Sequence, residues 1–373
     1  MLRPRRLLCA AALIALALLV FSLPGLLHRE PGSAPGTEAT QRRLLRIWLV
    51  QGEDHRIPGG AAQWLQSQLR VWEKQHPGVL TYLRTVSPQE ALREDAILPD
   101  VMLYAPGTLT DPQALFMPLT GTLNAREALL RCGRWQGRQY GLPLCWGAWV
   151  MTIDGALTPG ESATPAPKTL LGKPSATAIP NAAEPDYPLA AASQAACALQ
   201  SPGGAALFSL AMLLPQRPPL PEDFASLTSA EVYRLFRSQQ CATAMLTSGQ
   251  VTALEGLAAA GKGPAFRVMA PEEIVTDLIL LGSVTPDAPA EAAMLLAHLV
   301  SRPAQEALSA QSLHTVRDDL TLYAAGDSAA IERSGVRSLS AINAYLPPQQ
   351  VQQAAWQAFQ GTLSFTEALL PLL

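Results

Sequence analysis

The sequence predicts an α/β protein of two lobes, and three observations support this fold class. A chain of 373 residues exceeds what one hydrophobic core usually organises, so two lobes are expected. Between Leu44 and Tyr104, apolar runs alternate with amphipathic segments, which is typical of a parallel sheet wound with helices. The apolar run from Leu144 to Ile153 could leave one lobe and enter the other, so we expect the chain to cross there.

Five segments form the alternation in the first lobe. The expected strands cover 44–51, 79–86 and 101–104, and the expected helices cover 61–75 and 88–95. Ligands of such sheets bind beyond the carboxyl ends of the strands, where this chain places Gln51, Glu53, Asp54 and Tyr104. An amide, two carboxylates and a ring suit a ligand with hydroxyl groups and an apolar face. The structural alternatives are solvated loop charges and a core tyrosine.

Two tryptophans mark the predicted crossing. Gln136-Gly137 predicts a hairpin turn before it, and Pro143 favours extended backbone at its start. Trp146 and Trp149 are three residues apart, so a strand directs them to opposite faces. Only one can then face a cleft, and Trp146, nearer the crossing, is the first choice. Both are candidate ligand-binding residues, with core packing as the alternative.

The rest of the chain predicts a second lobe rich in helices, after a proline-rich surface segment at 158–188. Gln250 follows a strand in an expected tight turn, where its amide could meet a ligand, and Tyr323 lies in an expected third crossing. The expected strands and extended pieces are 241–246, 266–269, 279–284, 314–316 and 320–323. The expected helices are 189–199, 204–214, 229–239, 288–299, 304–310, 327–334, 337–344, 349–360 and 364–369.

The first residues have the pattern of an export signal. Arginines at 3, 5 and 6 precede an apolar run to Leu27, which fits a signal peptide or a membrane anchor at 1–27. Both alternatives stay open, because the run satisfies the length of either segment. Residues 28–43 are polar with proline and glycine, and predict a flexible linker. We therefore expect residues 1–27 to contact the membrane.

Charge and cysteine spacing exclude several classes of protein. A formal charge of −3 gives no electrostatic basis for binding nucleic acid. After export, Cys132, Cys145, Cys197 and Cys241 could form disulfides, with buried thiols as the alternative. No Cys-x-x-Cys pair or paired histidines occur, so no metal or other cofactor is expected. No catalytic motif is present either, and we expect a protein that is not an enzyme.

Short motifs add a family resemblance. They are Ile47-Trp48-Leu49-Val50, Leu69 to Val79, Leu98-Pro99-Asp100-Val101, Tyr140-Gly141-Leu142-Pro143, Cys241 to Met245 and Glu291 to Leu308. In this order and spacing, the chain from Leu44 onward resembles the extracellular solute-binding proteins of ABC importers, in the sugar-binding group that includes maltodextrin-binding protein. The resemblance covers nearly the whole exported portion.

This resemblance implies a type II periplasmic-binding-protein-like fold, with two α/β lobes joined by crossing strands. On the family pattern, the first lobe is 44–147 plus 271–314 and the second is 148–270 plus 315–373. It also implies a monomer that captures a small solute, of the carbohydrate class, in a cleft between the lobes. The solute would pass to an ABC permease at the extracellular face of the cytoplasmic membrane.

The sequence departs from the family pattern at three places. Trp146-Gly147 stands where a carboxylate is common, and Gln250-Val251 stands where a tryptophan is common. The family's second-lobe helix start is reduced to Pro167-Lys168-Thr169-Leu170. With the proline-rich segment and an anchor that stays uncleaved, these departures keep a second function open. It is a membrane-tethered sensor or scaffold that uses a degenerate solute-binding fold.

Overall fold

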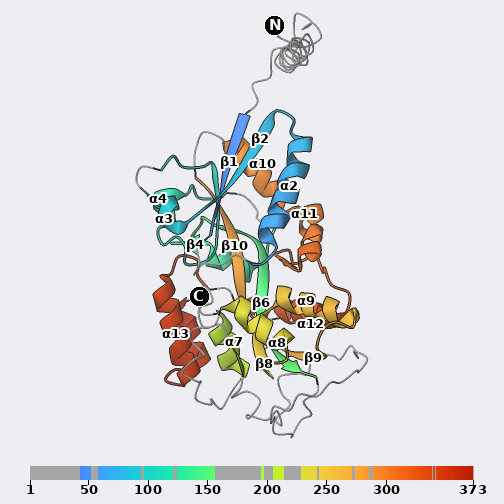
Figure 1. Ribbon diagram of the computed structural model, residues 1–373. Helices are drawn as coiled ribbons and strands as arrows, with labels where there is room; N and C mark the ends of the chain where they lie inside the picture. The colour runs from blue at the N-terminus through green and yellow to red at the C-terminus, as the bar shows by residue number, and fades with distance from the viewer. Residues whose placement is uncertain are drawn as a thin grey trace, which may run out of the picture. The chain divides into compact units, whose positions relative to one another are not determined.

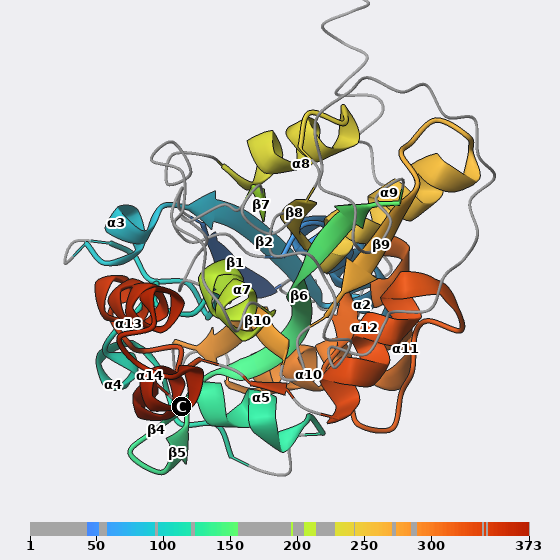
Figure 2. The ribbon, with the colours of Figure 1, turned by 90° about the horizontal axis from the view of Figure 1, so that it is seen from below.

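The structure is a computed structural model, shown from two directions in Figures 1 and 2. It describes residues 43–51, 58–93, 96–120, 124–155, 195–196, 205–213, 228–241, 243–270, 274–284, 289–337, 339–340 and 342–372. The predicted signal peptide or anchor at 1–27, nearly all of the linker at 28–43 and the segment at 158–188 lie outside these residues. Among the described helices, none is long and apolar enough to cross a membrane.

The amino-terminal elements follow the predicted alternation. They are β1 (Arg43–Val50), α2 (Ala61–Gln75), β2 (Val79–Val86), α3 (Pro88–Ala91) and β3 (Val101–Tyr104). β1 and β3 are parallel, with Ile47 opposite Val101, and β2 lies beside β1 at the sheet edge. The predicted bounds agree with the structure to within one residue, except that α3 ends four residues early, at Ala91.

Short elements lead from β3 into the crossing. They are α4 (Pro112–Leu115), α5 (Glu127–Cys132), β4 (Arg134–Trp135) and β5 (Arg138–Gln139). The predicted hairpin joins β4 to β5, which pair antiparallel. Gln136 and Gly137 have φ angles of 46° and 77°, the left-handed pair that a type I′ turn requires.

The strand β6 (Leu142–Asp154) changes partners along its length. Residues 142–148 pair with β10 (Ile274–Ser283), and 149–153 pair with β8 (Thr243–Thr247). β11 (His314–Thr315) pairs with Cys145 and Trp146, and β9 (Phe266–Met269) pairs with residues 151–154 of the same strand. We call β1, β2, β3, β10, β11 and residues 142–148 the first sheet. The second sheet is β8, β9, residues 149–154 and β7 (Ala195–Ala196).

Helices cover both sheets. They are α7 (Ala205–Leu213), α8 (Ser229–Arg237), α9 (Ser248–Ala259), α10 (Pro289–Leu299), α11 (Arg302–Glu306), α12 (Gly326–Arg337), α13 (Pro348–Gln360) and α14 (Phe365–Leu369), with 3-10 turns η3 (Ala307–Gln311) and η4 (Leu370–Leu372). α2, α10 and α11 lie along one side of the first sheet (Figure 1). Trp64 joins α2 to α11, because its indole N–H donates to Ala304 O at 2.9 Å.

Two separate apolar cores form around these layers, and β6 belongs to both. Leu142, Leu144 and Cys145 are buried in the core that contains α2 and α10. From Trp146 onward, the buried residues of β6 belong to the core that contains α7, α8 and α13. The strand therefore leaves one core and enters the other within the predicted apolar run. Residues 44–373 form one contact unit, so the lobe boundaries expected at 147/148, 270/271 and 314/315 stay predictions.

Three predictions of local structure are wrong. Ala195 and Ala196 form β7 where helix 189–199 was expected, and β12 (Leu339–Ser340) replaces part of helix 337–344. Pairing with β8 and β10 overrides helix propensity at these short segments. The helix α9 was read as a tight turn, because its sequence carries two glycines and little amphipathic period.

The cysteines of the described part are thiols. Cys132, Cys145 and Cys241 are free, so the disulfides that the sequence permitted do not involve them; Cys197 lies outside the described residues. Burial raises the pKa of all three thiols, and that of Cys241 rises to about 11. A thiol with a raised pKa is a poor nucleophile at neutral pH, so these groups act as core side chains.

Candidate functional site

Elements of the two sheets converge at Gly147, in the middle of β6. A Cβ at this position would lie 3.5 Å from Ser248 Oγ and 3.7 Å from Pro58 Cβ. Pro58 precedes α2 on the first sheet, and Ser248 begins α9 beside the second. A methyl group at Gly147 would make ordinary van der Waals contact with both residues. Gly147 thus lies where residues beside the two sheets approach the same strand.

The start of α9 is fixed against β6 by side-chain hydrogen bonds. The backbone N–H of Ala148 donates to Ser248 Oγ at 3.1 Å. Thr247 and Gln250 form a capping box, in which each side chain accepts from the other residue's backbone N–H. The amide nitrogen of Gln250 also donates to O and Oγ of Ser229, each at 3.0 Å. Gln250 therefore holds the helix start in place.

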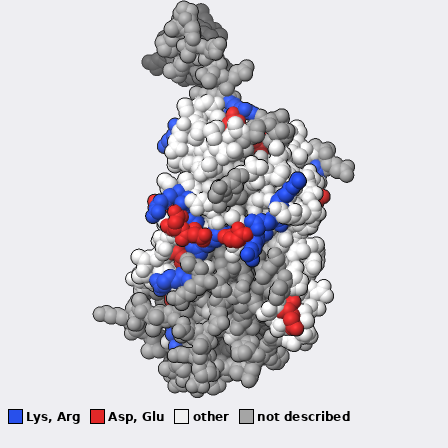
Figure 3. Space-filling model, turned by 180° about the vertical axis from the view of Figure 1, so that it is seen from behind, with Lys and Arg blue, Asp and Glu red and all other residues white. Residues whose placement is uncertain are grey.

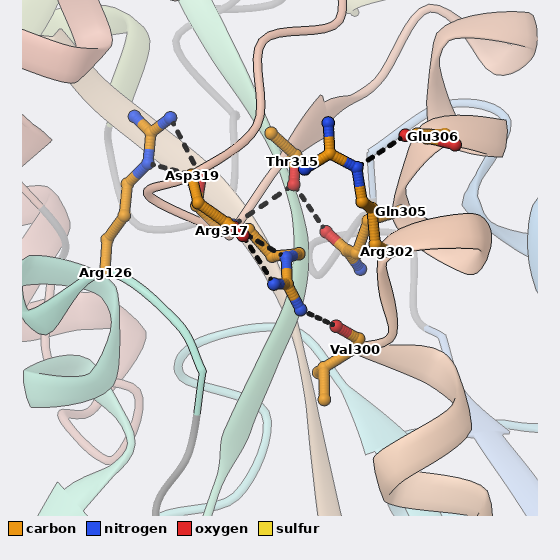
Figure 4. Close-up of polar contacts among 8 residues, drawn as sticks. All are labelled: Arg126, Val300, Arg302, Gln305, Glu306, Thr315, Arg317 and Asp319. Carbon is orange, nitrogen blue, oxygen red and sulfur yellow. Dashed lines mark hydrogen bonds and ion pairs between the residues drawn. The ribbon is translucent and has the colours of Figure 1, made fainter.

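Gln305 ties three segments together, and Figure 4 draws its hydrogen bond with Thr315. Its side chain is fully buried, and its amide nitrogen donates to Leu144 O and Leu299 O at 2.9 and 3.0 Å. Its amide oxygen accepts from Thr315 Oγ1 and the Val316 N–H at 2.8 and 3.1 Å. All four hydrogen-bonding positions of the amide are used. The segment that leaves β11 is thus anchored to β6 and α10.

Two arginines also fix the segment after β11 by hydrogen bonds (Figure 4). Arg317 binds both carboxylate oxygens of Asp319 at 2.8 and 2.7 Å and donates to Val300 O at 3.0 Å. Arg126 is buried and donates from Nε and an Nη to Arg317 O, at 3.3 Å each. Burial lowers the pKa of Arg126, with Asp318 opposing that effect. The backbone near Arg317 is therefore fixed to the first-sheet side.

The far end of the segment is attached to α12. The carboxylate of Glu332 accepts the backbone N–H groups of Leu322 and Tyr323, at 2.9 and 3.0 Å to Oε2. Glu255 of α9 in turn accepts from Asp327 N and Ser328 Oγ, at 2.8 Å each, at the start of α12. Residues 318–321 therefore connect an end fixed to α10 and α11 with an end fixed to α12.

Tyr104, a predicted ligand-binding residue, is buried in this structure. Its hydroxyl and that of Tyr345 share a hydrogen bond of 2.7 Å, and its ring stacks on Phe116 at 5.2 Å between centroids. Tyr345 donates onward to Gly133 O at 3.3 Å. Burial raises the pKa of Tyr104 well above its ordinary value. The carboxyl end of β3 is therefore packed against the segment before α13.

The tryptophans at the crossing are also buried. Trp146 is 0% exposed and Trp149 is 2% exposed, so neither ring presents a face to solvent here. The indole N–H of Trp146 donates to Thr315 O at 2.7 Å, and its ring stacks on His314 with centroids 4.3 Å apart. Both rings pack in the core to which the second half of β6 belongs. A ligand-binding role for either stays a prediction.

The remaining predicted site residues occupy different environments. Gln51 follows β1 and is exposed, while Glu53 and Asp54 lie outside the described residues. Tyr323 is half-buried, and its hydroxyl donates to Leu313 O at 2.9 Å. Gln51 is thus the predicted residue with a side chain open to solvent, and the others of the described set have structural contacts.

Sequence reasoning missed the residues that organise the crossing: Ser248, Gln305, Arg126, Arg317, His314 and Glu332. Most of their contacts join residues that are far apart in the sequence, and no local sequence pattern predicts them. Gln305 was noticed only within the motif Glu291 to Leu308. Polar residues in the described segments form no group of three or more that could hold a metal ion.

Surface charge on one face of the molecule is mixed. Figure 3 shows acidic and basic side chains close together in a band across this face. Arg131 and Arg134 both pair with Glu127, at 3.7 and 2.9 Å, and Arg302 pairs with Glu306 at 2.9 Å. Such a band lacks the extended positive potential that nucleic-acid binding needs.

Comparison with solved structures identifies the fold. The GacH receptor of Streptomyces glaucescens, solved with acarbose, superposes with a TM-score of 0.57 over 88% of this chain and 95% of that chain, at 14% identity. An ABC substrate-binding protein from Listeria monocytogenes, solved with cycloalternan, gives 0.55 over 88% and 97%, at 12% identity. A cyclic α-maltosyl-1,6-maltose binding protein from Arthrobacter globiformis gives 0.55 over 87% and 96%, at 14% identity.

These similarities show that the chain has the two-lobe, type II periplasmic-binding-protein fold that the sequence predicted. No family model and no curated protein sequence matches the chain. The chain therefore shares this fold with proteins to which its sequence is only 12–14% identical.

Proposed function

We propose that the protein is an extracytoplasmic solute-binding protein that captures a small carbohydrate between its lobes for an ABC transporter. The main support is that β6 pairs in both sheets and packs in both cores, in a fold shared with sugar-binding receptors. A pair of lobes joined in this way can close on a ligand by bending a few connecting residues. We infer binding without catalysis.

The proposed ligand site is the space over Gly147. Pro58 before α2 and Ser248 at the start of α9 border it. Gln51 follows β1 of the same sheet, which β3 and β10 separate from β6. The first-turn N–H groups of α9 attract ligand oxygen atoms, because a helix start carries a partial positive charge. Glu53 and Asp54 would add acceptors for sugar hydroxyl groups. Tyr104, Trp146, Trp149, Gln250 and Tyr323 would contribute only where movement of the lobes uncovers them.

Export and partners complete the proposal. The arginines followed by the apolar run at 7–27 would carry the chain to the extracellular face of the cytoplasmic membrane, as a cleaved signal or as an anchor. There, as a monomer, it would present the bound solute to a permease. Closure of the lobes would distinguish the loaded protein from the empty one.

Thermal unfolding of the full chain with candidate solutes tests this function. We expect maltotetraose, acarbose or a related oligosaccharide to raise Tm, because a ligand at 100 times its Kd stabilises by about 2.7 kcal/mol. Amino acids and peptides serve as controls. An unchanged Tm with every sugar and polyol would reject the carbohydrate assignment.

A second function is favoured by the burial of the aromatic rings that the sequence predicted to bind a ligand. The rings of Tyr104, Trp146 and Trp149 are buried, and Gln250 is engaged in helix capping. A membrane-tethered sensor or scaffold with a degenerate cleft would keep such a fold without ligand capture. Lack of stabilisation by any small solute, together with retention of a protein partner in pull-downs, would favour this alternative.

A further inference from the structure

His314 is buried at the crossing without a hydrogen-bond partner. It is 1% exposed, and neither ring nitrogen has a partner among the described residues. The ring stacks on Trp146 with centroids 4.3 Å apart and is tilted against Tyr323 at 5.2 Å. Those two neighbours donate to Thr315 O and Leu313 O, so they do not bind the imidazole.

Such a burial is unfavourable for an imidazole. The neutral ring has one N–H donor and one acceptor nitrogen, and both are lost to solvent here without replacement. Protonation would be worse, because a buried cation without a counter-ion carries a still larger cost. Burial, followed by the positive charge of Arg126, lowers the pKa of His314 to about 3.

The charged groups around the ring do not offset this cost. β6 contributes the uncharged Trp146, and the residue before α5 contributes the cation Arg126. The segment after β11 contributes the phenol of Tyr323. The carboxylate of Glu332 on α12 accepts the backbone N–H groups of Leu322 and Tyr323. The packing thus favours a neutral imidazole that is not hydrated.

His314 lies on a segment that joins elements of the two sheets, so the free-energy cost of burying its imidazole can depend on how the sheets move. β11 begins the segment that Gln305 and Arg126 fix at one end and Glu332 fixes at the other. Because its two ends are fixed to different elements, a change in the relative position of the two sheets would act on this segment and on its packing against β6. We propose that His314 is a pH sensor of lobe movement: acid favours a conformation in which the imidazole is hydrated, over the conformation described here.

The inference rests on the fold and not on the identity of a solute. With an ordinary pKa of about 6.5 for a hydrated ring, lowering the pH from 7.5 to 5.0 shifts the ratio of the two conformations by up to about 30-fold. The window follows from the sign: the lowered pKa of the packed state disfavours that state as pH falls below about 6.5.

Two solution measurements on the ligand-free chain test the sensor. We expect small-angle X-ray scattering to give a larger radius of gyration at pH 5.0 than at pH 7.5, and amide hydrogen exchange at 314–323 to rise beyond its intrinsic pH dependence. His314→Phe should remove both changes, because it fills the same space without titrating. His314→Gln replaces it if the Phe variant does not fold.

His298→Phe is the matched control. His298 also has a buried nitrogen without a partner in the described part, but it lies on α10, away from the crossing. Its variant should keep the acid response of the wild type. A wild type without the response, a response that persists in both His314 variants, or one that His298→Phe also removes would overturn the proposal. Ligand binding is not needed, so failure here leaves the proposed function untouched.

Discussion

The aromatic residues near the crossing have polar atoms that are committed to the protein itself. Tyr104 and Tyr345 bond each other, and Trp146 bonds the backbone of β11. The rings of Tyr104 and Trp146 are also buried, so their faces are not open to a ligand in this structure. Measuring stability and affinity together distinguishes rings that only pack in the core from rings that lobe movement exposes to a ligand.

Removing each ring distinguishes the two roles. If Tyr104 and Trp146 are packing residues, alanine at either position should lower the free energy of unfolding by ~3–5 kcal/mol. If they contact a sugar, the stability loss should be smaller and the affinity should fall by ~1–3 kcal/mol. Urea unfolding and calorimetric titration with maltotetraose measure both quantities. We expect the first result, since both rings are 0% exposed.

Gly335 of α12 is required by the same tryptophan. A Cβ there would lie 2.5 Å from Trp146 Cη2, well inside contact distance. Gly335→Ala should therefore destabilise by ~1–3 kcal/mol despite the better helix propensity of alanine. Gly256→Ala in α9 is the control, because its Cβ would meet nothing within 4 Å and should stabilise by ~0.5–1 kcal/mol. Equal effects in the two urea titrations would show that α12 does not pack tightly on β6.

At the scale of elements, β6 and the segment after β11 depend on buried side-chain hydrogen bonds. Gln305→Leu would leave Leu144 O, Leu299 O, Thr315 Oγ1 and the Val316 N–H without their partner. Each unpaired buried group costs ~1–3 kcal/mol, and partial relaxation makes ~3–5 kcal/mol the expected total. Gln352→Leu, on an exposed position of α13, should change stability by less than about 0.5 kcal/mol. A loss below about 1 kcal/mol for Gln305→Leu would mean that water replaces the amide.

The elements that could be predicted are those with strong local patterns. α2 was bounded correctly because its apolar period ends at His76-Pro77-Gly78, and the 136–137 turn because glycine tolerates positive φ. α9 was missed because it has two glycines and little amphipathic period, although Thr247 and Gln250 carry the local pattern of a capping box. β12 could not be predicted, because pairing with a distant strand defines it. The site was harder still. Sequence could place Tyr104 at a strand end, but only packing against Phe116 and Tyr345 decides whether its ring is open.

At the scale of the whole molecule, the meeting of the two halves over Gly147 makes a prediction about closure. A leucine there would occupy the space between Pro58 and Ser248, where a Cβ already lies 3.7 and 3.5 Å from their atoms. It should therefore disfavour approach of these elements by ~1–3 kcal/mol, which is about a 5- to 150-fold loss of affinity. Unfolding stability should change less, since opening relieves the clash. The radius of gyration of Gly147→Leu should stay unchanged when maltotetraose is added, while that of the wild type decreases. Gly147→Ala, whose methyl group fits, should behave as the wild type. If Gly147→Leu binds and contracts normally, the ligand site lies elsewhere and closure does not bring Pro58 and Ser248 together.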